Sequence, residues 1–254
     1  PMPSICNMMD TRRSNNRRMP QHLPSLADEQ IPDWDNIDCV FLDMDGTLLD
    51  LKYDNRVWNE LVPEAFARHS GKPLAAAKAD LLAHMREISG TIEYYSFEYW
   101  SAFTGVDLIA EHHQAVDLLA YRPGALDFLR WLKTSHCRSV IATNAHRSSI
   151  AVKDQNIQIS AEVDAVVSSQ DYHAPKEADA FWQAMLTDFP YDPGRCIFVD
   201  DNVPVLNAAA RNKIGGVYAI ATPDSLQPSR SDLGFPTFDH FADICPSLNV
   251  ARTH

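Results

Sequence analysis

The chain has 254 residues and a net charge of −12, from 22 Lys and Arg residues against 34 Asp and Glu residues. Hydrophobic residues (45%) and charged residues (22%) are at levels typical of globular proteins, and no apolar run reaches the roughly 18 residues of a membrane-spanning helix. Since an acidic chain holds a polyphosphate backbone poorly, we expect a small-molecule partner, and neither nucleic acid nor a membrane. The N-terminus has no apolar signal core, so the expected compartment is the cytoplasm.

The first 36 residues differ in composition from the rest of the chain. Few of them are apolar, and an arginine-rich stretch lies amid Asn, Ser and Pro: Arg12, Arg13, Arg17 and Arg18. Such a composition is typical of a solvated tail. Residues 1–36 are therefore predicted to form a disordered basic extension.

A buried parallel sheet is predicted from residue 38 onward. Residues 39–42 (CVFL) form a short, fully apolar run, as expected for a strand with both faces covered. Similar runs follow at 138–143, 162–168, 195–199 and 216–220, and amphipathic helices are predicted at 124–134, 177–188 and 203–212. Strands that alternate with helices indicate an α/β fold with a doubly wound parallel sheet, whose ligands bind beyond the carboxyl ends of the strands.

Residues 52–121 interrupt this alternation, because they contain only helical stretches. Helices are predicted at 56–70, 74–89, 93–104 and 107–119, and three of them stop at a glycine: Gly71, Gly90 and Gly105. We therefore expect an inserted all-helical cap domain at 52–121, and an α/β core formed by residues 37–51 and 122–254.

The cysteines show no metal-binding or disulfide pattern. Their number is odd and no pair has Cys-x-x-Cys spacing: Cys6, Cys39, Cys137, Cys196 and Cys245. Buried, reduced thiols are the expected state.

Two acidic pairs follow predicted strands. Asp43 and Asp45 come directly after the strand at 39–42, and Asp200 and Asp201 come directly after the strand at 195–199. Because parallel strands end at the same edge of a sheet, these carboxylates would repel one another without a cation. Carboxylate oxygens suit a hard divalent ion, so the pattern predicts a Mg²⁺ site.

Further polar residues are expected at the same edge. Thr143 and Asn144 end the strand at 138–143, and Lys176 precedes the helix at 177–188. A hydroxyl, backbone N–H groups and an ammonium near a helix start are suited to the oxygens of a phosphoryl group. Singly, each residue is more often a cap or a solvated side chain; it is their order along the chain that favours a phosphate site.

This order resembles the four motifs of the haloacid dehalogenase superfamily: Asp43-Met44-Asp45-Gly46-Thr47, Thr143-Asn144, Lys176 and Asp200-Asp201. The resemblance implies that Asp43 attacks phosphorus to form an aspartyl-phosphate, and that Asp45 protonates the leaving oxygen and then deprotonates water. It also implies Mg²⁺ ligands in Asp43, the backbone carbonyl of Asp45, and Asp200. The remaining implied roles are phosphate binding by Thr143, Asn144 and Lys176, and support by Asp201 and Thr47.

Asp45 separates two activities within that superfamily. A dehalogenase displaces halide from carbon and needs no acid for its leaving group, whereas a phosphatase needs one. Since Asp45 is present, phosphoryl chemistry is predicted.

Other segments resemble the bacterial GMP/IMP nucleotidases of this superfamily. They run from the first strand nearly to the C-terminus: 49–51 (LDL), 54–55 (DN), Trp58, 61–64 (LVPE), 99–101 (YWS), 143–146 (TNAH), 151–153 (AVK), 175–177 (PKE) and 223–225 (PDS). The resemblance implies a 5′-nucleotidase for purine ribonucleoside monophosphates, and it leaves out the basic N-terminal extension.

Candidate substrate-binding residues lie in the predicted cap and on nearby loops. Asp54 and Asn55 are predicted to recognise the base or ribose, and His146 lies on a loop at the active edge. His112 and His113, far from the motifs in the sequence, are predicted to be at the surface. Several aromatic residues are candidates for stacking on a purine or, alternatively, for the cap's own core: Trp58, Tyr94, Tyr95, Phe97, Tyr99 and Trp100.

Two other functions stay open on the sequence alone. The same core with a different cap would suit a sugar-phosphate or phosphoglycolate phosphatase, or a phosphomutase. A non-catalytic regulatory protein is a further alternative, but a binding module has no need of Asp43, Asp45, Lys176 and Asp200 together. The sequence gives no prediction of the oligomeric state.

Overall fold

The structure of the protein, a computed structural model, describes residue 26, residues 30–245 and residue 248. The described residues build one sheet in which all neighbouring strands are parallel: β1 (Cys39–Leu42), β2 (Arg138–Thr143), β3 (Ala165–Ser168), β4 (Cys196–Asp200), β5 (Gly216–Ile220) and β6 (Thr237–Phe238). The strand order is β3-β2-β1-β4-β5-β6, so β1 lies in the interior between β2 and β4. The predicted α/β fold with a parallel sheet is confirmed.

Strand β1 is apolar throughout because both faces of the sheet are covered. Val40 and Leu42 pack into one hydrophobic cluster, whereas Cys39 and Phe41 pack into another. This alternation is the one that strand geometry imposes. None of the four side chains has exposed surface, so β1 forms the centre of the core.

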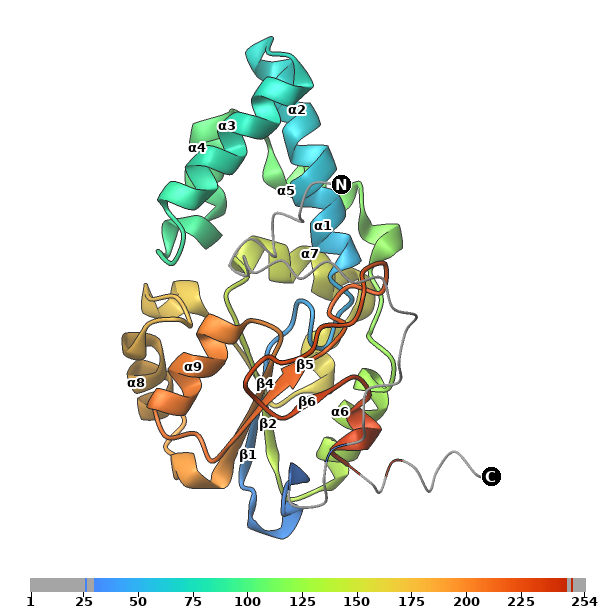
Figure 1. The fold of residues 1–254 in the computed structure, drawn as a ribbon, viewed down its shortest axis with the longest axis vertical. Helices are drawn as coiled ribbons and strands as arrows, with labels where there is room; N and C mark the ends of the chain where they lie inside the picture. The colour runs from blue at the N-terminus through green and yellow to red at the C-terminus, as the bar shows by residue number, and fades with distance from the viewer. Residues whose placement is uncertain (1–25, 27–29, 246–247, 249–254) are drawn as a thin grey trace.

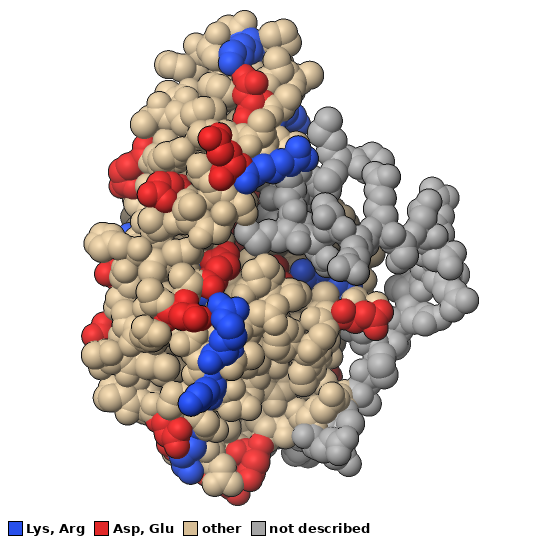
Figure 2. Space-filling model, turned by 60° about the vertical axis from the view of Figure 1, so that its left-hand side comes forward, with Lys and Arg blue, Asp and Glu red and all other residues tan. Residues whose placement is uncertain are grey.

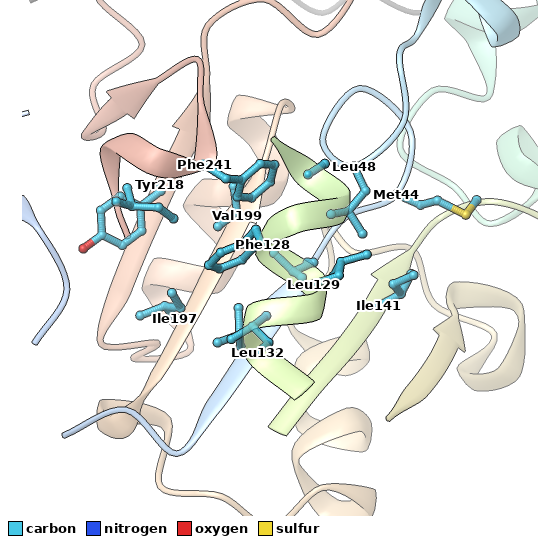
Figure 3. Packing of buried hydrophobic residues seen from close by; sticks show 14 of the residues in the cluster. Met44, Leu48, Phe128, Leu129, Leu132, Ile141, Ile197, Val199, Tyr218 and Phe241 are labelled. Carbon is cyan, nitrogen blue, oxygen red and sulfur yellow. The ribbon is translucent and has the colours of Figure 1, made fainter. Parts of the chain in front are cut away.

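Helices cover both faces of the sheet (Figure 1). Helix α6 (Ala125–Thr134) covers one face and points Phe128, Leu129 and Leu132 at the strands (Figure 3). The other face is covered by α8 (Asp179–Asp188) and α9 (Val203–Arg211). These helices cover the faces of the sheet and leave the carboxyl ends of its strands accessible for a site.

A second group of helices lies beyond the carboxyl ends of the strands, in the upper part of Figure 1. These helices share a hydrophobic cluster of their own, which is separate from the two clusters on the sheet. They follow β1 in the chain: α1 (Lys52–Arg56), a π-helical turn (Val57–Leu61), α2 (Val62–Ser70), α3 (Leu74–Glu87), α4 (Phe97–Thr104) and α5 (Leu108–His113). We call residues 52–118 the helical insertion.

Some elements differ from the sequence predictions. The strand expected at 162–168 begins only at Ala165, because Ile159–Glu162 forms a 3-10 turn. Helix α7 (Arg147–Ile157) and strand β6 were not predicted. Most residues of α7 are polar, which obscures its periodicity, and two residues in β6 are too few to form a pattern.

Part of the predicted N-terminal extension packs against the core, which corrects its boundary at residue 36. The ring of Trp34 lies 5.8 Å from that of Phe128 and 4.8 Å from that of Trp131, and its Nε1 donates a hydrogen bond to the carbonyl of Ile244 at 2.8 Å. An aromatic side chain with partners in the core orders its own segment. The rest of the prediction, residues 1–25 and 27–29, lies outside the described residues.

Four of the cysteines are buried and free, as expected: Cys39, Cys137, Cys196 and Cys245. Cys6 lies outside the described residues. Within the described part of the chain, no helix combines the length and apolar character that crossing a membrane requires.

Phe128 should be a major contributor to stability. It has no exposed surface, and its ring stacks on that of Phe241 at 4.8 Å between centroids. We expect Phe128→Ala to lower the free energy of unfolding by about 3–5 kcal/mol, because it leaves a cavity between α6 and the sheet. Urea unfolding measures this. The control Leu226→Ala, at a position that is 76% exposed, should change the value by less than about 0.5 kcal/mol; equal effects of the two substitutions would contradict the packing described.

Candidate active site

Three carboxylates meet at the carboxyl edge of the sheet. Asp43 follows β1, Asp200 ends β4 and Asp201 comes next, and one oxygen of each lies within 4.8 Å of the others. Backbone contacts hold them: the N–H of Asp43 donates to the carbonyl of Val199 at 2.9 Å, and the N–H of Asn202 donates to Asp200 Oδ1 at 2.7 Å. We call Asp43, Asp200 and Asp201 the acidic cluster.

Gly46 allows the two acidic loops to lie close together. Its φ of +93° is a left-handed conformation that favours glycine. A Cβ at this position would lie 2.9 Å from Cγ of Asp201. Both the backbone conformation and the close approach of Asp201 therefore explain why this position of the motif is a glycine.

Lys176 is the cation of the acidic cluster. Its Nζ lies 2.5 Å from Asp43 Oδ1 and 2.7 Å from Asp200 Oδ2, and the residue is 2% exposed. Burial alone would lower the pKa of Lys176, but the charges of Asp200 and Asp43 more than offset this, so its pKa is raised. The side chain is therefore a fixed positive charge at the sheet edge.

Burial raises the pKa of the acidic cluster above the usual 3.8, to about 7 for Asp43 and about 6 for Asp200 and Asp201. Lys176 lowers the pKa of Asp43 and Asp200, and Arg230 lowers that of Asp201, but in each case by less than burial raises it. The negative charges of neighbouring carboxylates raise these pKa values further. Added positive charge would therefore stabilise the ionised cluster.

The donor set of the acidic cluster fits Mg²⁺. Carboxylate oxygens are the hard ligands that this ion prefers, and it usually takes one or two of them together with water. Lys176, together with Arg230 at 3.9 Å from Asp201, offsets only part of the charge of three ionised carboxylates, so a divalent cation would neutralise the excess. The acidic cluster could therefore hold a divalent ion, and the ligand set expected from the sequence, which is Asp43, Asp200 and the backbone carbonyl of Asp45, stays a prediction.

Asp45 lies apart from the acidic cluster. Its Oδ1 accepts a hydrogen bond from Lys153 Nζ at 2.6 Å, and the same Nζ donates to Asp54 Oδ1 at 2.8 Å. Burial, followed by the charge of Asp45, raises the pKa of Asp54 to about 7. The carboxylate of Asp45 is thus directed to a second cation, Lys153, and the expected role of its backbone carbonyl at the metal stays a prediction.

The predicted phosphate-binding residues lie beside the acidic cluster. Thr143 and Asn144 end β2 and line the same cavity as Lys176. Asn144 Oδ1 accepts a hydrogen bond from the Lys176 N–H at 2.9 Å, which ties the two residues together. Thr47 is fully buried, and its Oγ1 has no hydrogen-bond partner among the described residues.

A cavity of about 660 Å³ connects these groups to the helical insertion. Its core side contains Asp43, Asp45 and Lys176. Its other side contains most of the predicted substrate-binding residues and several neighbours: Asp54, Trp58, Arg86, Tyr94, Tyr95, Phe97 and His146. The site and the helical insertion therefore share one space.

One sequence prediction about this cavity is wrong, and another is not tested by the structure. Asn55 Nδ2 donates to Asp224 Oδ2 at 2.6 Å and Asn55 is not among the residues that line the cavity, so its contact with a substrate stays a prediction. His112 is not at the surface: it is 1% exposed, lies on the cavity wall beside Phe97, and burial lowers its pKa to about 3. Helix α5 folds back onto α1, which brings His112 to the cavity despite its distance from the motifs in the sequence.

Comparison with known proteins identifies the family. Residues 37–212 match the family model of the haloacid dehalogenase-like hydrolases. The chain belongs to this family. The match contains β1, the helical insertion and the acidic cluster, so the resemblance predicted from the sequence is confirmed for the hydrolase as a whole.

Individual relatives of the hydrolase agree with this assignment. It is 31% identical to the GMP/IMP nucleotidase YrfG of Escherichia coli over 215 residues, which are 85% of this chain and 97% of the relative. The HAD phosphatase of Thermococcus onnurineus has the same fold (TM-score 0.68, 15% identity, 84% and 98% coverage). So does the HAD-hydrolase YfnB of Bacillus subtilis, a structure bound to magnesium (TM-score 0.59, 12% identity, 84% and 99% coverage).

Two residues that support the site belong to segments that resemble the nucleotidases, 151–153 and 175–177, but no role was predicted for either of them. Lys153 contacts Asp45 and Asp54, and Glu177 accepts hydrogen bonds from Tyr95 OH at 2.6 Å and Asn144 Nδ2 at 3.1 Å. Glu177 thereby links the helical insertion to Asn144, a predicted phosphate-binding residue. A lysine spaced with Ile150 and Ile157 on one helical face was the available signal for Lys153, but the helix itself was missed.

Mg²⁺ binding to the hydrolase should depend on pH. Because the folded-state pKa values of the acidic cluster are raised, the metal-free folded state binds more protons than the unfolded state, and its stability falls as pH rises from about 4 to 7. Mg²⁺ requires the ionised carboxylates, so it should raise the Tm more at about pH 8 than at about pH 5.5.

Thermal unfolding with and without MgCl₂ at both pH values measures this effect. Asp200→Asn is the matched variant, because it removes one charge of the cluster with little change in shape, and its Tm should respond less to Mg²⁺. A Tm increase that is independent of pH and unchanged in Asp200→Asn would show that the ion binds elsewhere.

Proposed function

We propose that this hydrolase is a Mg²⁺-dependent phosphomonoesterase that hydrolyses purine nucleoside 5′-monophosphates, with GMP and IMP as the preferred substrates. The observation that carries the proposal is the grouping of Asp43, Lys176 and Asp200 at one end of a cavity whose other end is aromatic. The relative with 31% identity, a GMP/IMP nucleotidase, supports the choice of substrate.

Each core residue has a role in this proposal. Asp43 attacks phosphorus, the ester bond to the leaving oxygen breaks, and the phosphoryl group is carried on Asp43 as an aspartyl-phosphate. Asp45 gives its proton to the leaving oxygen and then takes a proton from the water that hydrolyses the aspartyl-phosphate. Lys176, Thr143 and the Asn144 amide bind the phosphoryl oxygens and stabilise their charge.

The metal would be held by Asp43, Asp200 and the backbone carbonyl of Asp45, with Asp201 supporting its water ligands. When bound, it lowers the repulsion between the Asp43 carboxylate and the anionic phosphate. A Bacillus subtilis protein of the same fold has been solved bound to magnesium, which is compatible with the choice of ion.

The wall formed by the helical insertion suits a purine ring. Trp58, Tyr94, Tyr95 and Phe97 place several aromatic rings on the cavity, and stacking of a base on one such ring contributes about 1–3 kcal/mol in other binding sites. The exposed guanidinium of Arg86 lines the same cavity. An arginine donates well to O6 and N7 of a 6-oxopurine, whereas adenine has a donor at its position 6. We therefore propose that the helical insertion acts as the substrate-selecting cap.

The surface charge agrees with a small substrate. On the face drawn in Figure 2, the described Lys and Arg residues lie interspersed with Asp and Glu residues and form no broad basic patch. With a net charge of −12, such a surface attracts a polyphosphate chain poorly. The charge distribution therefore agrees with a mononucleotide substrate better than with a polynucleotide.

The direct test is phosphate release from a panel of monoesters, with Mg²⁺ or with EDTA: GMP, IMP, AMP, CMP, UMP, phosphoglycolate and glucose phosphates. We expect release that needs Mg²⁺, is fastest with GMP or IMP, and is abolished in Asp43→Asn. A preference for phosphoglycolate or a sugar phosphate would contradict the proposed purine nucleotide substrate, but it would still agree with the proposed phosphatase mechanism. No release from any monoester by the folded wild type would favour a regulatory protein.

Arg86 should contribute to the choice of base. We expect Arg86→Met to lower kcat/KM for GMP relative to AMP by a factor equivalent to about 1–3 kcal/mol, because the substitution removes the donor to O6 and N7. Arg130→Met, an exposed arginine on α6 and away from the cavity, is the matched control. An unchanged ratio of GMP to AMP in Arg86→Met would exclude this role.

A further inference from the structure

Lys153 is a fully buried lysine that the proposed reaction does not use. It lies on α7, and its side chain has no exposed surface. Its Nζ lies 2.6 Å from Asp45 Oδ1, 2.8 Å from Asp54 Oδ1 and 3.1 Å from Asp54 Oδ2. The ring of Tyr53 also faces it, with 5.1 Å between Nζ and the ring centroid. Because a buried ammonium is costly without charged partners, these contacts account for its position.

The contacts of Lys153 join three separate parts of the chain. Asp45 belongs to the loop after β1, Asp54 and Tyr53 belong to α1 of the helical insertion, and Lys153 itself belongs to the core. The burial of Asp54 and Tyr53, which are 8% and 0% exposed, shields the ion pairs from water. An ion pair shielded in this way fixes geometry more firmly than one at the surface.

The main consequence is for the orientation of Asp45. Asp45 is two residues from Asp43, yet its carboxylate is not part of the acidic cluster. Lys153 binds Oδ1, so Oδ2 is the oxygen left to contact a ligand in the cavity that Asp45 lines. We infer that Lys153, held by Asp54, is a positioning residue for Asp45: it keeps the carboxylate away from the metal site and presents Oδ2 to the leaving oxygen.

This inference rests on the proposed phosphatase function. It predicts that the effect of losing Lys153 on the rate depends on the leaving group of the substrate. A nucleoside 5′-oxygen is a poor leaving group and needs a proton from Asp45, whereas p-nitrophenolate leaves without one. The parameter kcat/KM includes only the steps up to departure of the leaving group, so it is insensitive to the later hydrolysis of the aspartyl-phosphate. A residue that acts through Asp45 should therefore affect the two substrates differently.

The experiment measures kcat/KM for GMP and for p-nitrophenyl phosphate with the full chain and Mg²⁺. We expect Lys153→Met to lower the value for GMP by about 100-fold or more, the scale of general acid catalysis, and the value for p-nitrophenyl phosphate by less than about tenfold. The double variant Lys153→Met with Asp54→Asn removes both charges of the buried pair, so it should fold at least as well and show the same selective loss. Lys52→Met, at a partly exposed lysine that pairs with Asp50 at 3.5 Å, should leave the ratio of the two values unchanged.

The outcomes separate the inference from the proposed function. If the wild type hydrolyses neither substrate, the phosphatase proposal fails. If the wild type hydrolyses both, and the single and double variants lose activity on both equally or keep full activity on GMP, the positioning role of Lys153 is overturned. The same selective loss on GMP and on glycerol 3-phosphate, which also has a poor alkoxide leaving group but carries neither base nor ribose, supports it. A loss on GMP alone would report a change in substrate recognition by Asp54 and the helical insertion, and would overturn it.

Discussion

The structure depends on the repulsion among carboxylates that the fold brings to one sheet edge. Burial and mutual proximity raise the pKa of four of them, so their ionised forms require positive charge nearby. Two buried lysines supply part of it, and a metal ion at the acidic cluster would supply the rest. The groups concerned are Asp43, Asp45, Asp54, Asp200 and Asp201, with Lys153 and Lys176.

The two lysines divide these carboxylates into parts with different tasks. Lys176 holds Asp43 and Asp200, the part suited to a metal and a phosphoryl group. Lys153 holds Asp45 and Asp54, the part suited to proton transfer. In the proposed reaction this division allows two acids of one short loop, Asp43 and Asp45, to have different roles, because each carboxylate contacts its own lysine and only Asp43 belongs to the acidic cluster.

The sequence was sufficient for features that depend on local pattern. The apolar run of β1 and the acidic residues directly after β1 and β4 predicted both the sheet and the acidic cluster, because parallel strands end at a common edge. The sequence was insufficient to predict contacts between segments that lie far apart along the chain. Lys153 meets Asp54 only because α7 packs under α1, and His112 reaches the cavity only because α5 folds back. The helical spacing of Lys153 with Ile150 and Ile157 could indicate that its side chain faces the core, but it does not indicate which residue of another segment it contacts. Likewise Asn55, a neighbour of Asp54, contacts the distant Asp224.

The central claim is that Asp43, held by Lys176 at the acidic cluster, carries the phosphoryl group. The most direct measurement is to quench the enzyme with acid during turnover of GMP with Mg²⁺ and to treat it with borohydride, which expels the phosphate and converts the phosphorylated aspartate to homoserine. Mass spectrometry of the peptides then locates the homoserine. The account predicts an acyl-phosphate on Asp43, absent in Asp43→Asn, which should also release no phosphate. Turnover with no phosphoryl group on Asp43, or turnover that continues in Asp43→Asn, would contradict it.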